Sequence, residues 1–213
     1  QLFTVNFPGL TRIAIQVRQL TNGNFDVNDL VGFAGDEIIV TRTDMNHAGE
    51  IYSFNLKKNT WKQISNVNTD TYKTLALSKT EKRYVTTTDG KKMLVWVILP
   101  PNFDATKKYP TLLFCQGGPQ SPLTQSYSFR WNFSLMAANG YVIVAPNRRG
   151  MQGHGVAWNE QISKDWGGQV MDDYLSAIDD VSKENYVDKA RLGCVGASYG
   201  GYSVFYLAGI HNN

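Results

Sequence analysis

The stretch that decides the fold runs from Ala190 to Tyr202 and reads Ala-Arg-Leu-Gly-Cys-Val-Gly-Ala-Ser-Tyr-Gly-Gly-Tyr. A short apolar run leads into the pattern Gly-x-Ser-x-Gly centred on Ser198, and an apolar segment over residues 204–210 follows it. This order predicts a strand that ends at a sharp turn, with a helix beginning directly after the turn. Ser198 would then lie at the apex, exposed at the carboxyl end of a sheet.

The two glycines of the pattern, Gly196 and Gly200, fit so tight a turn. A side chain at either position would collide with the neighbouring strand or helix, and glycine tolerates the backbone angles that the turn requires. The first turn of the helix would offer free N–H groups and its positive dipole end to a developing oxyanion. We therefore predict that Ser198 is a nucleophile. The alternative is a serine that lies between glycines in an ordinary loop.

Composition excludes several classes of function. The chain has 213 residues, 42% of them hydrophobic, which suits one large domain or one and a half smaller ones. The net charge of +3 is mild, and no block of Lys and Arg points to nucleic acid or to an acidic membrane surface. No apolar run is long enough to span a membrane. Composition does not determine the cellular compartment.

Cysteine and histidine usage predicts neither a disulfide framework nor a metal site. Cys115 and Cys194 both lie in apolar runs, as expected for buried thiols. The three histidines are scattered and have no ligand spacing, so we expect no metal and no cofactor.

Residues 1–68 have a sequence pattern typical of antiparallel β structure. Strand-like runs and turn signals alternate there: the runs are 13–17, 37–40 and 50–54, and the turns are 22–24 and 57–59. Residues 25–64 hold about four short strands, the content of one blade of a β-propeller. Because a single blade cannot bury both of its faces, we expect further blades ahead of residue 1.

After a polar linker at residues 69–81, strands and helices alternate from residue 82 to residue 213. Asp89-Gly90 predicts a hairpin turn, and a helix with apolar positions at 170, 171, 174, 175, 178 and 181 would turn Asp172, Asp173, Asp179 and Asp180 to solvent. The predicted elements are strands 84–88, 93–99, 111–115, 141–145 and 192–197, with a crossover helix in 126–138. This order predicts an α/β fold, the N-terminal half of an α/β-hydrolase sheet.

Three phrases carry a resemblance to a known family. They are Gly-Gly-Pro-Gln-Ser at 117–121, Asn-Arg-Arg-Gly at 147–150 and Gly-Ala-Ser-Tyr-Gly-Gly-Tyr at 196–202. In this order and spacing they resemble the prolyl oligopeptidase family of serine peptidases, above all its dipeptidyl-peptidase IV and acylaminoacyl-peptidase branches. The resemblance covers most of residues 77–213. It implies a β-propeller that gates access to an α/β-hydrolase domain, and a peptide substrate.

The resemblance also implies roles for single residues. Ser198 matches the nucleophile, and Tyr199 matches the residue whose backbone N–H helps to form the oxyanion hole and whose ring borders the substrate pocket. A second oxyanion donor comes from the loop after the third strand. The dipeptidyl-peptidase branch uses a tyrosine hydroxyl there, whereas this chain has Gln116, so either the Gln116 amide or a loop N–H such as that of Gly117 must serve. Arg148 and Arg149 match an Arg-Gly loop near the site, where they contact substrate or tie loops together.

A complete catalytic triad is not present in the printed sequence. In this fold the acid and the histidine follow the serine, but no Asp or Glu follows Ser198, and His211 falls at the end of its helix. His154 precedes the serine and would break the chain order, and His47 belongs to the first region. We therefore expect the triad Asp and His beyond Asn213 in a longer parent protein, and we expect this chain alone to be inactive.

Three further expectations complete the hypothesis. The strand 192–197 would lack a partner on its outer side, so we expect homo-oligomer formation through that edge. A different α/β-hydrolase, such as an esterase, would share the turn at Ser198 but would have no propeller upstream. A non-catalytic binding protein with a hydrolase-like fold is the other alternative.

Overall fold

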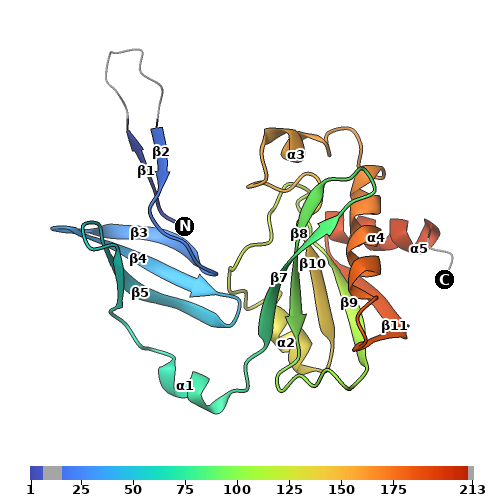
Figure 1. The fold of residues 1–213 in the computed structure, drawn as a ribbon, viewed down its shortest axis with the longest axis horizontal. Coiled ribbons are helices and arrows are strands. Elements are labelled where there is room, and N and C mark those ends of the chain that lie inside the picture. The colour runs from blue at the N-terminus through green and yellow to red at the C-terminus, as the bar shows by residue number, and fades with distance from the viewer. Residues whose placement is uncertain (7–15, 211–213) are drawn as a thin grey trace. The chain divides into compact units, whose positions relative to one another are not determined.

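The computed structural model describes residues 1–6 and 16–210, and these residues form two compact units (Figure 1). One unit consists of residues 1–75 and 124–132, and the other consists of residues 76–123 and 133–213. The predicted strand at 13–17 lies mostly outside the described residues, as does His211.

The first unit is antiparallel. Strands β1 (Phe3–Asn6) and β2 (Gln16–Gln19) pair with each other. Strands β3 (Asp26–Ala34), β4 (Glu37–Asp44), β5 (His47–Asn55) and β6 (Thr60–Gln63) form a four-stranded sheet in chain order. The prediction of four short strands within residues 25–64 is therefore confirmed. A short helix, α1 (Thr69–Thr74), follows within the stretch that we expected to be a linker.

Aromatic packing holds the four-stranded sheet together. The Trp61 ring contacts Phe25 edge-on, at 5.5 Å between ring centres, and also packs against Phe54. The Arg42 guanidinium lies 3.8 Å from the centre of the Phe25 ring and adds a cation–π contact.

The second unit is built on a five-stranded sheet in the order β11-β9-β10-β8-β7. Its strands are β7 (Lys79–Thr86), β8 (Lys92–Leu99), β9 (Tyr109–Cys115), β10 (Val142–Pro146) and β11 (Val187–Gly196). As Asp89-Gly90 predicts, β7 and β8 form an antiparallel hairpin, and Gly90 has a φ of +81°. Strand β9 pairs in parallel with both β10 and β11, so the carboxyl ends of these three strands share one edge of the sheet.

The described part of the second unit contains four helices, and α3 lies beyond the ends of the strands (Figure 1). They are α2 (Phe133–Ala138), α3 (Val156–Glu160), α4 (Gln169–Val181) and α5 (Tyr199–Ile210). Helix α4 packs on β7, β9 and β10, while α5 packs on β9 and β11. The core residues of β8 and β10 are almost completely buried, which explains why these strands read as continuous apolar runs.

Of two further predictions for this unit, one is confirmed over a shorter span and one is wrong. The crossover helix lies within residues 126–138 but begins only at Phe133, and residues 124–132 belong to the first unit. Asp173 does not face solvent: it is fully buried, whereas its neighbour Asp172 is exposed.

Strand β11 pairs with β9 and with no other strand of the described chain. Leu192 on this strand and Phe205 on the neighbouring helix α5 are exposed, by 41% and 83%. No helix among residues 1–6 and 16–210 is long and apolar enough to cross a membrane.

Candidate active site

The turn at Ser198 joins the end of β11 to the start of α5, so the predicted strand, turn and helix are all present. Ser198 is exposed and has a φ of +57°, a left-handed backbone conformation that costs a residue other than glycine about 1–3 kcal/mol. The Gly200 N–H donates to the Ala197 carbonyl at 2.9 Å, and the Tyr202 N–H donates to the Ser198 carbonyl at 3.1 Å. These bonds begin the helix directly after the serine.

Close backbone packing determines the shape of this turn. A Cβ atom at Gly200 would collide with the carbonyl oxygen of Cys115, the last residue of β9. A Cβ atom at Gly196 would lie 2.7 Å from the Gly200 carbonyl oxygen. The end of β9, the end of β11 and the start of α5 therefore meet at distances that only glycine allows.

The loop after β9 lies against the serine. A Cβ atom at Gly117 would lie 2.9 Å from the Ala197 carbonyl oxygen and 3.5 Å from the Ser198 Cβ. The Gln116 side-chain amide donates to the Ser121 hydroxyl, at 3.3 Å between the nitrogen and Oγ. Of the two candidate oxyanion residues of this loop, Gly117 contacts the serine turn, whereas the Gln116 amide bonds within its own loop.

Tyr199 is only 4% exposed, and its hydroxyl donates to the Trp166 carbonyl at 2.8 Å. Its ring meets the Trp166 indole edge-on at 5.3 Å and lies 5.6 Å from the Tyr202 ring. Burial raises the pKa of Tyr199 to about 12, and the nearby charge of Arg148 opposes this shift. The hydroxyl is therefore neutral and orders the Trp166 segment. Nothing in the sequence patterns singled out Trp166.

Arg148 and Arg149, in the loop after β10, are both fully buried. Arg148 bonds to the 116–119 loop: its Nη2 donates to the Gln116 carbonyl at 3.1 Å, and its Nη1 donates to the Pro119 carbonyl at 2.6 Å. Arg148 Nη1 also donates to the Arg149 carbonyl at 2.7 Å, and its Nε donates to the Tyr174 hydroxyl at 3.1 Å. In the structure, three of the four hydrogen bonds of the Arg148 side chain therefore go to carbonyl groups of loop residues.

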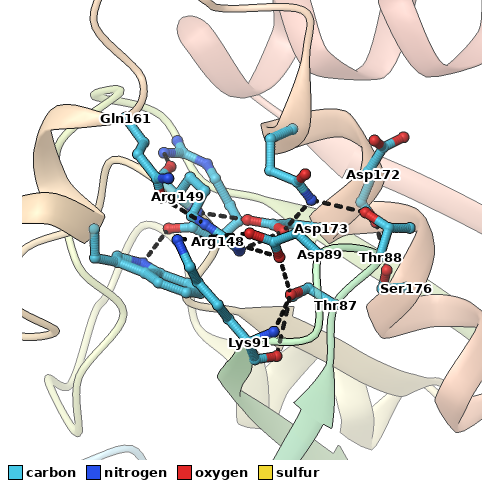
Figure 2. Close-up of polar contacts among 12 residues, drawn as sticks. Thr87, Thr88, Asp89, Lys91, Arg148, Arg149, Gln161, Asp172, Asp173 and Ser176 are labelled. Carbon is cyan, nitrogen blue, oxygen red and sulfur yellow. Dashed lines mark hydrogen bonds and ion pairs between the residues drawn. The ribbon is translucent and has the colours of Figure 1, made fainter.

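Arg149 is the centre of a buried ion-pair network (Figure 2). Its Nη1 lies 2.8 Å from a carboxylate oxygen of Asp173 on α4, and its Nη2 pairs with Asp89 in the β7–β8 turn. Its Nε donates to Gln161 Oε1 at 2.8 Å, and its guanidinium lies 4.1 Å from the centre of the Trp158 ring. Arg149 therefore ties a helix, a hairpin and two loops together.

The two carboxylates of this network have opposite pKa shifts. Burial raises the pKa of Asp173 to about 6, and bonds from the Arg149 backbone N–H and its charge oppose this shift. Hydrogen bonds from Arg149 and Thr87 hold the pKa of Asp89 well below its usual range. Asp89 is partly exposed, so water hydrates its charge, whereas Asp173 is fully buried.

No hydrogen bond joins the Ser198 hydroxyl to a histidine or a carboxylate within residues 1–6 and 16–210. His154 is exposed ahead of α3, with its ring 6.0 Å from that of Trp158, and partial desolvation lowers its pKa. His47 pairs with Asp44 in the first unit, at 2.8 Å. The described part of the chain also holds no group of three or more His, Cys, Asp or Glu side chains placed to bind a metal.

Comparisons with known proteins agree with this geometry. Residues 127–213 match the model of the prolyl oligopeptidase family. The chain is 50% identical over 198 residues to a dipeptidyl-peptidase 5 of Porphyromonas endodontalis. This alignment covers 92% of the chain and 28% of that relative. It is 48% identical over 197 residues to the dipeptidyl-peptidase 5 of Porphyromonas gingivalis, again over 92% of this chain and 29% of the relative. The chain thus spans less than a third of the length of both.

Solved structures share the fold. An acylaminoacyl peptidase in complex with Z-Gly-Gly-Phe-chloromethyl ketone aligns with a TM-score of 0.82 and 23% identity, over 98% of this chain and 32% of its own. Dipeptidyl peptidase 4 of Porphyromonas gingivalis aligns with a TM-score of 0.69 and 25% identity, over 90% of this chain and 28% of its own. Motifs, sequence relatives and fold agree, and the chain belongs to the prolyl oligopeptidase family.

Proposed function

We propose that this chain is part of a serine peptidase of the dipeptidyl-peptidase type and that Ser198 is its nucleophile. One observation carries the proposal: an exposed serine, strained to a φ of +57°, lies between the Gly117 loop and the first turn of α5. Strain of this kind is expected at functional sites, where the surrounding packing maintains it. The names of the 50% and 48% identical relatives support peptide substrates.

In the proposed reaction, Ser198 Oγ attacks the carbonyl carbon of the scissile peptide bond while a base takes the hydroxyl proton. The negative charge that develops on the substrate oxygen is stabilised by the backbone N–H groups of Tyr199 and Gly117 and by the positive end of α5. The C–N bond then breaks, the amine leaves with the proton, and the acyl chain remains as an ester on Ser198. Water hydrolyses this ester and regenerates the serine.

The proposal requires an acid and a base from residues outside the 213 of this chain. We expect a longer protein that contains this chain to hydrolyse peptides, and the 213 residues alone to be inactive. Measuring the peptidase activity of both forms tests this requirement. Activity of the shorter form would mean that a base is available within it, and His154 would be the first candidate to replace.

The architecture that we propose follows the same comparison. Residues 1–68 form the end of a β-propeller, residues 69–81 link the domains, and residues 82–213 begin the α/β-hydrolase domain. The four-stranded antiparallel sheet of β3 to β6 supports a blade, and the parallel pairing of β9, β10 and β11 supports the hydrolase sheet. An experimental structure with a propeller ahead of this sheet would support this arrangement, and a different domain there would contradict it.

The open side of β11 supports a proposal about assembly. We propose that two copies of the 213-residue chain associate through this edge, where Leu192 is exposed and the backbone has no partner strand among the described residues. Size-exclusion chromatography of the chain would then show a dimer or larger species. A monodisperse monomer would contradict the proposal.

The activity test uses a dipeptidyl amide with a free amino terminus as substrate for the longer protein. Ser198→Ala should lower kcat by roughly a million-fold, as for the nucleophile of a related reaction. Ser203→Ala is the matched control, because Ser203 lies on the same helix, is fully buried and donates to the Tyr199 carbonyl. Activity that survives in Ser198→Ala would overturn the proposal, and cleavage of esters but not of amides would favour an esterase.

A further inference from the structure

Arg148 has an unusual environment for a charged residue. It is fully buried, and all four of its hydrogen bonds go to neutral acceptors: three main-chain carbonyls and the Tyr174 hydroxyl. No ion pair joins it to a carboxylate of the described chain, whereas its neighbour Arg149 pairs with two. Buried arginines are rarely unpaired, because removing a charge from water is costly.

The hydrogen bonds of Arg148 have a clear geometric effect. Two of its acceptors, the carbonyls of Gln116 and Pro119, lie at the two ends of the loop that contains Gly117. Gly117 is the residue of this loop that lies against the Ser198 turn. A guanidinium is rigid and planar, so one side chain fixes both ends of the loop relative to the serine.

The charge of Arg148 also lies close to the turn. Its guanidinium carbon is 4.8 Å from the centre of the Tyr199 ring, and Tyr199 directly follows the serine. Burial raises the pKa of the Cys115 thiol, at the strand end against which Gly200 packs, and the Arg148 charge opposes this shift. A positive charge in so buried a place interacts more strongly with a nearby negative charge than it would in water.

We infer that Arg148 is a positioning residue for the proposed reaction. It holds the Gln116–Pro119 loop against Ser198 and favours the negative charge that develops on the substrate oxygen next to that loop. The inference rests on the proposed function, and it assigns to Arg148 a role that Arg149 does not share. Arg149 is neutralised by Asp89 and Asp173 and stabilises the fold (Figure 2).

The test compares rates in the full-length protein with wild-type Ser198. Arg148→Met should lower both kcat and the rate of Ser198 labelling by a fluorophosphonate by about a hundred-fold, the size expected when a reacting group shifts by about 1 Å. The KM should change little, because the substrate is bound by other groups. Arg148→Lys keeps the charge but loses the planar fork, so it should recover about tenfold of the lost rate.

Two further variants separate this role from simple stabilisation. Asp89→Asn weakens the Arg149 network, so it should lower the melting temperature without changing the labelling rate of the folded protein. Tyr174→Phe removes the hydroxyl that accepts from Arg148 Nε and should lower the labelling rate only a few-fold, because Arg148 keeps its three bonds to main-chain carbonyls. If Arg148→Met does not fold, Arg148→Lys and Tyr174→Phe decide the question.

The outcomes are distinguishable. If the wild-type protein is labelled at Ser198 and the Arg148 and Tyr174 variants are labelled at the same rate, this inference is wrong while the proposed function stands. Equal losses in Asp89→Asn and Arg148→Met at equal melting temperatures would also overturn it. If the wild-type protein hydrolyses peptides but is not labelled at Ser198, the proposed function fails, and the inference fails with it.

Discussion

The Ser198 turn follows β11 and the Arg149 network follows β10, two strands that β9 separates in the sheet, and different forces hold them. Backbone atoms in close contact hold the turn, where Gly200 packs on the carbonyl of Cys115. The network is held by charges, with one guanidinium between the carboxylates of Asp89 and Asp173. A larger side chain should therefore disturb the turn, whereas a change of pH should not. The network should respond to pH and should tolerate a larger side chain better.

Arg148 connects the two regions. Its backbone carbonyl accepts a hydrogen bond from the Trp158 indole at 3.0 Å, on the side of the network. Its side chain bonds to the 116–119 loop, on the side of the turn. Two adjacent arginines thus serve different regions, which the phrase Asn-Arg-Arg-Gly alone does not reveal.

The largest effect on stability is expected for Arg149→Met. This change leaves the fully buried Asp173 carboxylate without a counter-charge, which should cost about 3–5 kcal/mol of the free energy of unfolding. Denaturation with urea measures the loss. The double variant Arg149→Met/Asp173→Leu removes both charges and should recover most of the stability. If the double variant is as unstable as the single one, the charges are not what holds the network.

The pH dependence of stability should come next in size. Because burial raises the pKa of Asp173 to about 6 in the folded protein, the folded state keeps a proton that the unfolded state has lost near pH 4. The contribution of Asp173 to the free energy of unfolding is therefore fully present below about pH 4 and is lost as the pH rises through 6. The loss should amount to about 3 kcal/mol.

The comparison with Asp173→Asn isolates this contribution, because asparagine does not titrate. The stability of the wild-type protein minus that of the variant should fall between pH 4 and pH 7. Asp89 acts in the opposite sense: its pKa is lowered, so its contribution is present above pH 4 and is lost as the pH falls. Parallel pH profiles of the wild-type protein and Asp173→Asn would contradict the assignment.

The smallest of these effects on stability, but one with a functional consequence, is expected for Gly200→Ala. The added methyl group must displace the end of β9, which should cost about 1–3 kcal/mol and should shift Gly117 away from Ser198. The folded Gly200→Ala protein should then no longer be labelled at Ser198 by a fluorophosphonate.

Gly209→Ala is the control on the same helix, since a Cβ atom there meets nothing within 4 Å. Because alanine favours helix over glycine, this change should be neutral or stabilising by up to about 1 kcal/mol. If both variants are labelled equally well, close packing at Gly200 does not determine the geometry of the turn.

The parts of the fold that sequence predicts well are those set by local patterns. The Gly-x-Ser-x-Gly pattern places a strand, a turn and a helix around Ser198, and Asp89-Gly90 places the hairpin of β7 and β8. The prediction of a crossover helix within residues 126–138 is confirmed only for 133–138, because residues 126–132 pack with the first unit. A contact with a distant part of the chain decided that segment, and no local pattern reports such a contact.

Asp173 shows how a site residue was missed although a signal existed. Its position is three residues after Val170 and four before Ala177, so it shares the buried face of α4 with both. The prediction that Asp173 faces solvent with Asp172 rests only on its charge. Its partner Arg149 is 24 residues away in sequence, so spacing alone does not pair them. An acidic residue on an apolar helix face is the pattern to search for.

The central claim is that Ser198 is the nucleophile, and fluorophosphonate labelling followed by mass spectrometry of the labelled peptide tests it most directly. The account predicts that the full-length protein carries the label on Ser198 and that Ser198→Ala is not labelled. A protein that hydrolyses peptides while its label lies on another serine, or while Ser198 stays unmodified, would contradict the account.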